Sequence, residues 1–367
     1  MIFPPIRGSV VRNENHRRNA SMATPDNRPV GSLISGIDQA WLDQVKEVPL
    51  EPDLPICDAH HHLWTRAEFP YLLPEFLADF GGHRIDRTVY LECASFYRGH
   101  GPEEMRPVGE VEFAVGVGAM AASGLYGEAR VAAAIVGYAD LQLGGRVAPV
   151  LEALAAAGAG RFRGIRNGGA WDPGFEFASR QERSREGLYR EPGFREGFAC
   201  LGRLGLTFDA WLYHPQLGDL VDLARAFPDQ PIVMNHVGGP IGVGSYAGRR
   251  AEVFPVWREG IRAVAACPNV FVKLGALSSK RAGFGWHERP VPPNSAELAE
   301  AWRPYIETCI EAFGPERCTF ESNFPVDKAS CSYGVLWNAF KRIAQGASAA
   351  EKAALFRETA MRFYRMD

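Results

Sequence analysis

The sequence has almost no net charge and no long apolar run. Its 40 Lys and Arg residues face 43 Asp and Glu residues, a formal net charge of −3, so a strongly basic surface for nucleic acid is excluded as its organising feature. No stretch of about 18 uncharged apolar residues, the length that a transmembrane helix needs, is present. We therefore expect a globular protein without nucleic-acid or membrane partners.

Cysteine is sparse and shows no pairing pattern. The seven cysteines are odd in number and widely scattered, and they form no CxxC motif. A disulfide framework and a zinc knuckle both require regular spacings, so neither is expected. We predict reduced, mostly buried thiols in a cytoplasmic protein.

The N-terminal segment is not expected to act as an export signal. Arg17 and Arg18 resemble a twin-arginine signal, but polar residues follow them where an apolar segment is required. We predict a largely flexible extension over residues 1–45, with a short helix around residues 37–45. Met22 offers a second candidate start, which would make the residues before it an extension of the natural chain.

From residue 46 onward, short β-branched runs alternate with longer segments of helical period. Eight such strands with no composition break between them predict a (β/α)₈ TIM barrel, one α/β domain over residues 46–367. The alternative is a doubly wound open sheet, but the Gly-rich phosphate loop that normally follows its first strand is absent. The predicted strands span residues 56–63, 88–93, 131–138, 162–166, 207–213, 232–237, 270–277 and 318–322.

Three of the segments that follow strands are long. They span residues 95–110, 167–192 and 278–295. In a barrel, such loops lie at the C-terminal ends of the strands, where active sites are built. We expect them to surround the mouth of the site.

Histidines on the first and sixth strands are candidate metal ligands. Side chains alternate along a strand, so Asp58, His60 and His62 should share one face while His61 points the other way. Two imidazoles on one face of a barrel strand can bind one divalent ion, zinc before manganese, although polar histidines without metal are the alternative. His236 ends the sixth strand before a Gly-Gly-Pro turn and is a candidate ligand or acid–base group.

The last strand carries the candidate catalytic carboxylate. Glu321 and Asn323 alternate onto one face, and Asp327 follows beyond the strand end. A carboxylate held near the histidines could act as general base for water. The candidate catalytic residues are therefore Glu321, His236 and Asn323.

Charged residues in apolar strands supply the candidate substrate contacts, because such charges are costly unless they are paired or used. Arg166 ends the fourth strand and is placed to hold an anionic group. For Arg166 and for Glu92 of the second strand, a structural ion pair is the alternative. Lys273 of the seventh strand should pair with an acidic neighbour, and Glu321 is the candidate. The remaining substrate-binding candidates lie at a strand end or in the loops and are His214, Tyr97, Trp171 and His287.

Four motifs occur in order along the chain: DAHHHLW, GIRN followed by AWD, MNHVGG and ESNFPVD. In this order they resemble the lactonase-like branch of the amidohydrolase superfamily, the amidohydrolase 2 group, which includes 2-pyrone-4,6-dicarboxylate lactonases and L-fuconolactonases. The resemblance covers residue 56 to the C-terminus. It implies a (β/α)₈ barrel with a mononuclear metal centre at the strand ends, to which His60, His62 and His236 correspond by position, although some members work without metal.

The resemblance also shows two departures. Asn323 stands where the family commonly has an Asp that acts as ligand or general base, and Asn167 stands where it often has His. An amide cannot take a proton from water at neutral pH. The usual assignment of the base therefore fails at Asn323, and Glu321 and His236 are the candidates to replace it.

The function that we expect is hydrolysis of a lactone or related cyclic ester of a carboxylated or sugar-acid small molecule. His60, His62 and a divalent ion would polarise the carbonyl, and Glu321 or His236 would activate water. Two alternatives stay open. A metal-dependent decarboxylase of an aromatic or unsaturated acid needs no such base, and a non-catalytic small-molecule-binding barrel needs no catalyst. The sequence is also compatible with a homo-oligomer.

Overall fold

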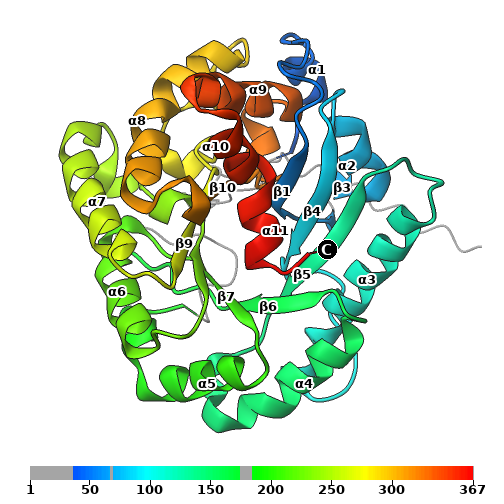
Figure 1. The fold of residues 1–367 in the computed structure, drawn as a ribbon, viewed down its shortest axis with the longest axis vertical. Coiled ribbons are helices and arrows are strands. Elements are labelled where there is room, and N and C mark those ends of the chain that lie inside the picture. The colour runs from blue at the N-terminus through cyan, green and yellow to red at the C-terminus, as the bar shows by residue number, and fades with distance from the viewer. Residues whose placement is uncertain (1–35, 67–68, 174–183, 367) are drawn as a thin grey trace, which may run out of the picture.

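The computed structural model describes residues 36–66, 69–173 and 184–366. Eight parallel strands form one sheet in the order β1-β4-β5-β6-β7-β8-β9-β10, with helices around it (Figure 1). The Asn323 amide donates to the carbonyl of His60 (2.8 Å) and the His62 amide to that of Phe324 (2.8 Å), which joins the last strand segment to the first. The predicted (β/α)₈ barrel is confirmed.

The barrel strands match the predicted positions and differ at their ends. They are β1 (Ile56–His61), β4 (Ile85–Leu91), β5 (Arg130–Gly137), β6 (Phe162–Arg166), β7 (Thr207–Ala210), β8 (Ile232–Met234), β9 (Val270–Leu274) and β10 (Cys318–Phe320). The antiparallel pair β2 (Trp64–Arg66) and β3 (Phe69–Tyr71) is an addition that the pattern does not predict.

Helices follow the strands, and most of them lie outside the ring of strands (Figure 1). They are α2 (Leu73–Asp79), α3 (Val108–Ala122), α4 (Ala148–Ala157), α5 (Pro192–Arg203), α6 (Leu217–Ala226), α7 (Arg250–Ala265), α8 (Ser295–Phe313), α9 (Tyr333–Ile343), α10 (Ala349–Ala353) and α11 (Thr359–Phe363). The expected long loops are present after β4 and β9; in the loop after β6, residues 174–183 lie outside the described part.

The predicted N-terminal extension is described only from residue 36 onward. There the expected helix is the single turn α1 (Gln39–Leu42), which Asp38 caps by accepting from the Trp41 amide (2.9 Å). The Trp41 indole donates to the carbonyl of Arg289 (2.9 Å), and Leu42 is buried. These contacts hold this turn against the loop before α8.

A register irregularity in β1 corrects one prediction. Asp58 pairs with Thr88 and His61 with Tyr90, so three steps on β1 match two on β4. Such a bulge places consecutive residues on the same side, and the simple alternation fails. Asp58 therefore does not share the face of His60: its carboxylate accepts from the Tyr333 hydroxyl of α9 (3.0 Å), on the outer side of the barrel.

The barrel interior is closed at the N-terminal ends of the strands by the C-terminal helix. Cys57, Val89 and Val233 of the strands pack with Ala360 and Phe363 of α11. In Figure 1 this helix, drawn in red, lies within the ring of strands. Because α11 closes this end of the barrel, a site can form only at the C-terminal ends of the strands.

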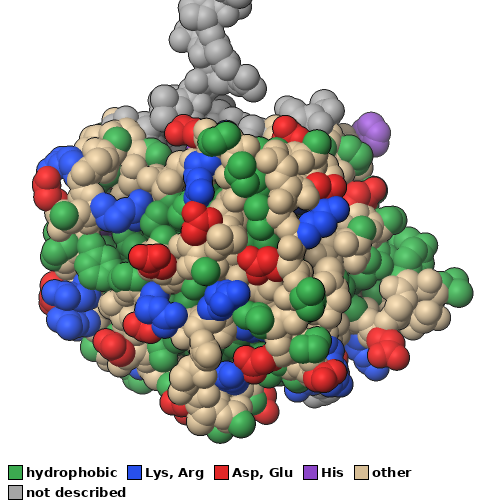
Figure 2. Space-filling model, turned by 90° about the horizontal axis from the view of Figure 1, so that it is seen from above, with side chains coloured by type: hydrophobic (Ala, Val, Ile, Leu, Met, Phe, Trp, Pro, Cys, Tyr) green, Lys and Arg blue, Asp and Glu red, His purple; other side chains and the backbone are tan. Residues whose placement is uncertain are grey.

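The outer surface carries charges of both signs. In Figure 2, acidic and basic side chains are interspersed on the face shown, in keeping with a net charge of −3. All seven cysteines are unpaired and buried, as predicted. Among the described residues, no helix has both the length and the apolar character to cross a bilayer.

A buried histidine outside the site makes stability depend on pH. His83 Nδ1 lies 3.0 Å from Lys341 Nζ and Nε2 lies 3.2 Å from the carbonyl of Gly334, so the ring accepts from the ammonium and is neutral. Burial and the charge of Lys341 lower the pKa of His83 to about 4. The unfolded chain takes up this proton below about pH 6.5 and the folded chain only near pH 4, so stability falls as pH drops through this window.

We expect His83→Gln to reduce the loss of unfolding free energy between pH 7 and pH 5 by about 1–2 kcal/mol, measured by urea unfolding at both pH values. His100→Gln, at an exposed histidine, is the matched control and should leave the loss unchanged. An equal loss in both variants would show that His83 does not cause it.

Candidate active site and metal centre

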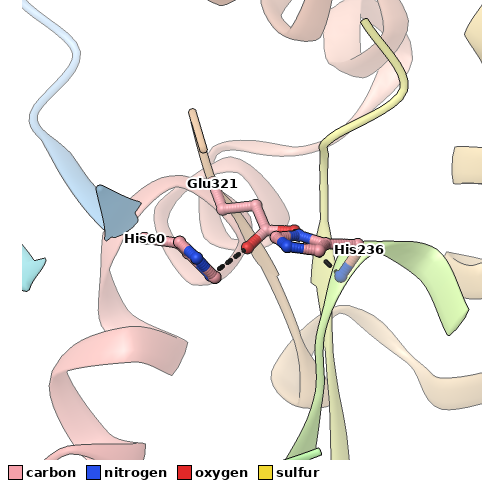
Figure 3. A group of neighbouring side chains, drawn as sticks. All are labelled: His60, His236 and Glu321. Carbon is pink, nitrogen blue, oxygen red and sulfur yellow. Dashed lines mark hydrogen bonds and ion pairs between the residues drawn. The ribbon is translucent and has the colours of Figure 1, made fainter. Parts of the chain in front are cut away.

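Three side chains from distant parts of the sequence meet at the C-terminal end of the barrel. His60 comes from β1, His236 follows β8 and Glu321 follows β10 (Figure 3). Glu321 Oε2 lies 2.9 Å from His60 Nδ1, and Oε1 lies 2.6 Å from His236 Nδ1. The potential ligand atoms all lie within 4.8 Å of one another, and all three residues are buried. We call these three residues the His–His–Glu group.

The Gly-Gly turn after β8 fixes His236 in this group. His236 and Val237 have φ angles of 60° and 46°, and Gly239 continues in the left-handed region. A Cβ on Gly239 would lie 2.2 Å from the carbonyl oxygen of Leu212, so only glycine fits there. The turn aims the His236 backbone N–H at Glu321 Oε1 (2.9 Å), which then accepts from both the backbone and the ring.

Burial keeps the two imidazoles neutral. It lowers the pKa of His60 and of His236 well below the ordinary value, and positive neighbours lower both further. Burial raises the pKa of Glu321 to about 7, although Lys273 and the His236 N–H oppose this shift. Neutral imidazoles present lone pairs, which metal binding requires.

The His–His–Glu group fits a divalent ion. Glu321 Oε2 is buried, and among the described residues it has no hydrogen-bond partner. His60 Nδ1 lies 2.9 Å from this oxygen and forms no hydrogen bond with it. Two neutral imidazoles and a carboxylate with a vacant oxygen form a donor set that suits zinc or manganese.

His62 lies on the other side of His60. The two Nε2 atoms are 3.1 Å apart, and His62 Nδ1 donates to the carbonyl of Leu91 (2.9 Å). The predicted ligand trio of His60, His62 and His236 is therefore brought together in part: the structure groups Glu321 with two of them, and the role of His62 stays a prediction.

Arg166 and Glu92 form a buried ion pair. Arg166 donates from Nε to Glu92 Oε1 (2.8 Å) and from one terminal nitrogen to the Glu92 carbonyl (2.5 Å). Its other terminal nitrogen lies 3.2 Å from His60 Nε2. Every nitrogen of this guanidinium thus has a protein partner, so the geometry favours orientation of His60 over a substrate clamp for Arg166.

Lys273 pairs with Asp209, and the prediction of Glu321 as its partner is wrong. Lys273 Nζ lies 2.7 Å from Asp209 Oδ1, and both side chains are 0% exposed. The register places Lys273 opposite Thr319, two residues below Glu321. The hydroxyl of Tyr364, the residue that follows α11, also donates to Asp209 (2.9 Å).

The Asn323 side chain is hydrogen-bonded to Asp327. Its side-chain amide donates to Asp327 Oδ1 (2.8 Å), and Asp327 Oδ2 accepts from the Ser278 amide (3.2 Å). Burial raises the pKa of Asp327 to about 7. In this position Asn323 joins the end of β10 to the loop after β9, and its predicted catalytic role stays untested.

The other predicted substrate-binding residues have contacts of their own in the loops, and their role in binding stays a prediction. The His214 ring packs against Tyr246 (ring centroids 5.2 Å apart), and burial lowers its pKa to about 4. The Trp171 amide donates to Gln216 (2.9 Å). His287 lies in the short turn Trp286–Glu288, and Tyr97 is half-buried in the loop after β4.

Two residues near His236 complete the described site. The Trp211 ring lies edge-on to His236, with centroids 4.7 Å apart. The Arg281 guanidinium lies over Trp211, 4.5 Å from the ring centroid. Sequence reasoning does not find Arg281, because an arginine in a long loop carries no pattern that signals burial.

Comparison with known proteins places the chain in a family. The sequence matches the amidohydrolase family over residues 57–366. The chain therefore belongs to the amidohydrolase family, as the motif resemblance implies.

Two relatives and one solved structure illustrate the likeness. The uncharacterized protein y4mH of Sinorhizobium fredii is 32% identical over 338 residues, which cover 86% of this chain and 99% of the relative. An L-fucono-1,5-lactonase of Burkholderia multivorans is 27% identical over 238 residues, 65% of this chain and 72% of the relative. An amidohydrolase of the same species, solved with bound zinc, shares the fold at a TM-score of 0.65 and 23% identity, covering 85% of this chain and 99% of that structure.

Proposed function

We propose that this protein is a hydrolase that opens the ring of a carboxylated lactone or a related cyclic ester. The observation that carries the proposal is the His–His–Glu group, in which two neutral imidazoles face a carboxylate with one oxygen that no described residue hydrogen-bonds. Similarity to an L-fucono-1,5-lactonase supports this reaction class. His60, His236 and Glu321 would hold the divalent ion.

A bound ion would supply a Lewis acid for the lactone carbonyl. Glu321 Oε1 is already held by the His236 backbone and ring, so Oε2 is the oxygen that can accept a proton from the attacking water. As water adds to the carbonyl carbon and the ring C–O bond breaks, this proton passes to the departing ring oxygen. The products are an alcohol and a carboxylic acid, which ionises at neutral pH to a carboxylate and one released proton, so the atoms and charges balance without a further reactant.

The neighbouring residues keep this geometry in place. The His60 ring lies between two residues: its Nε2 is 3.2 Å from a terminal nitrogen of Arg166, and its Nδ1 is 2.9 Å from Glu321 Oε2. Trp211 packs beside His236 and limits the space for the imidazole to turn. Preorganised groups of this kind contribute to catalysis because they need not reorganise during the reaction.

The test is a panel of lactones with and without a ring carboxylate, assayed by acid release on a pH-stat. We expect turnover of at least one carboxylated lactone after stripping with chelator and addition of zinc or manganese. Failure to open any member in every metal state would contradict the proposal. Release of CO₂ from an unsaturated or aromatic acid would favour a decarboxylase, and recovery of an unchanged bound compound would favour a binding barrel.

A further inference from the structure

Arg281 is a buried arginine that forms no ion pair with any carboxylate of the described residues. Its side chain belongs to the short turn Lys280–Ala282 in the loop after β9, and the residue is 2% exposed. One terminal nitrogen donates to the carbonyl of Ala276 at 3.4 Å, while Nε has no hydrogen-bond partner among the described residues. Within the same described part, no ion pair joins Arg281 to a carboxylate. The charges of Asp327 and Glu321 act on Arg281, but neither carboxylate forms an ion pair with it. A buried charge without a direct partner is destabilising, and it points to a ligand that supplies an anion in contact with the guanidinium.

The second buried arginine of the site provides the contrast. All three guanidinium nitrogens of Arg166 contact either Glu92 or His60. In the described part of the chain, the Nε of Arg281 has no hydrogen-bond partner. The arginine that sequence reasoning selects for anion binding is therefore neutralised, whereas the one that it does not select is available.

Arg281 lies on the His236 side of the His–His–Glu group. Its guanidinium covers the face of Trp211, and Trp211 in turn contacts His236. Its positive charge helps to lower the pKa of His236 and opposes the rise in the pKa of Glu321, so its field reaches both groups. A substrate carboxylate bound here would lie beside the reacting carbonyl.

Close backbone packing holds this turn in place. The Gly242 amide donates to the Arg281 carbonyl (2.9 Å). A Cβ on Gly242 would lie 2.4 Å from the Ala282 carbonyl oxygen, and one on Gly283 would lie 2.1 Å from the Gly242 carbonyl oxygen. The loops after β8 and β9 thus pack backbone against backbone, which fixes the position of the guanidinium.

We propose that Arg281 binds the carboxylate of the substrate and selects carboxylated over neutral lactones. This inference rests on the proposed function for its reaction. The edge of a guanidinium formed by Nε and a terminal nitrogen matches a carboxylate with two parallel hydrogen bonds. The face of Trp211 beneath the guanidinium supports this arrangement.

The kinetic test compares a carboxylated lactone with a neutral lactone of the same ring. Arg281→Met should lower kcat/KM for the carboxylated lactone about 100-fold and change that for the neutral lactone by less than about 3-fold. Arg281→Lys keeps the positive charge but not the paired N–H donors of the guanidinium, and kcat/KM for the carboxylated lactone should fall about 10-fold. Arg258→Met is the matched control, because Arg258 also has a buried Nε without a partner but lies on α7, over Phe254. Equal losses on both lactones would overturn the proposal.

A binding test separates this inference from the proposed reaction. Tetrahydrofuran-2-carboxylate and its neutral carboxamide are unreactive ring compounds whose affinities calorimetry can compare. Wild type should bind the carboxylate at least about 10-fold more tightly than the carboxamide, and Arg281→Met should abolish this ratio. If wild type prefers the carboxylate to the carboxamide but opens no lactone, the anion site is supported and the proposed reaction is wrong. Equal binding of both compounds by wild type would overturn the anion site.

Discussion

Replacing Glu321 with Gln should lower kcat/KM for lactone opening by about 1,000-fold, or about 4 kcal/mol of transition-state stabilisation. Glutamine keeps the length of the side chain but removes the charge that faces two neutral imidazoles. Its amide cannot accept a proton from water, and it is a poorer ligand for a divalent ion. Steady-state kinetics on the best lactone of the panel, together with metal analysis of the same preparation, measures both effects.

Glu311→Gln on the exposed surface of α8 is the matched control and should match wild type. A stable Glu321→Gln protein that retains metal but has lost turnover would assign the proton to this carboxylate. Loss of both metal and turnover would indicate that its contribution as a ligand dominates. Retention of full activity would contradict both roles and would turn attention to His236 or Asp327.

The architecture of the barrel could be predicted because it depends on local signals. β-branched runs such as β5 and β9 alternate with helical periods, and this pattern survives in a single sequence. The face of Asp58 could not be predicted in this way. The bulge between Asp58 and His61 depends on pairing with β4, and one added residue reverses the orientation of what precedes it.

The candidate site was predictable in its residue types and less so in its pairings. His60, His236 and Glu321 stand at strand ends, where the fold brings them together. The partner of Lys273 depends instead on the relative heights of β7, β9 and β10 inside the barrel, which no single strand encodes.

The burial of Arg281 depends on contacts that a sequence does not display. Two loops must pack together through Gly242 and Gly283 before the guanidinium is enclosed. Glycine in a loop is common, and its spacing gives no sign of which backbone it approaches. The interaction of loops is therefore the part of this site that required the structure.

Replacing Lys273 with Met should lower the free energy of unfolding by about 3–5 kcal/mol, because it leaves the Asp209 carboxylate buried without its counter-ion. Asn235 and Tyr364 still donate to this carboxylate, but neither carries a positive charge. Urea unfolding at neutral pH measures the loss. Lys46→Met, which breaks an exposed pair with Asp43, is the control and should cost less than about 1 kcal/mol.

The double variant Lys273→Met with Asp209→Leu should recover most of this loss, because an apolar pair replaces the unpaired charge.

The pH dependence of the stability of the single variant Lys273→Met gives an independent check. Burial already raises the pKa of Asp209, and Lys273 opposes that rise. Without Lys273 the pKa rises further, so the single variant should lose less stability at pH 5 than at pH 8, since a protonated carboxyl needs no counter-ion. A double variant no more stable than the single one, with a loss independent of pH, would show that Lys273 acts through packing rather than through its charge.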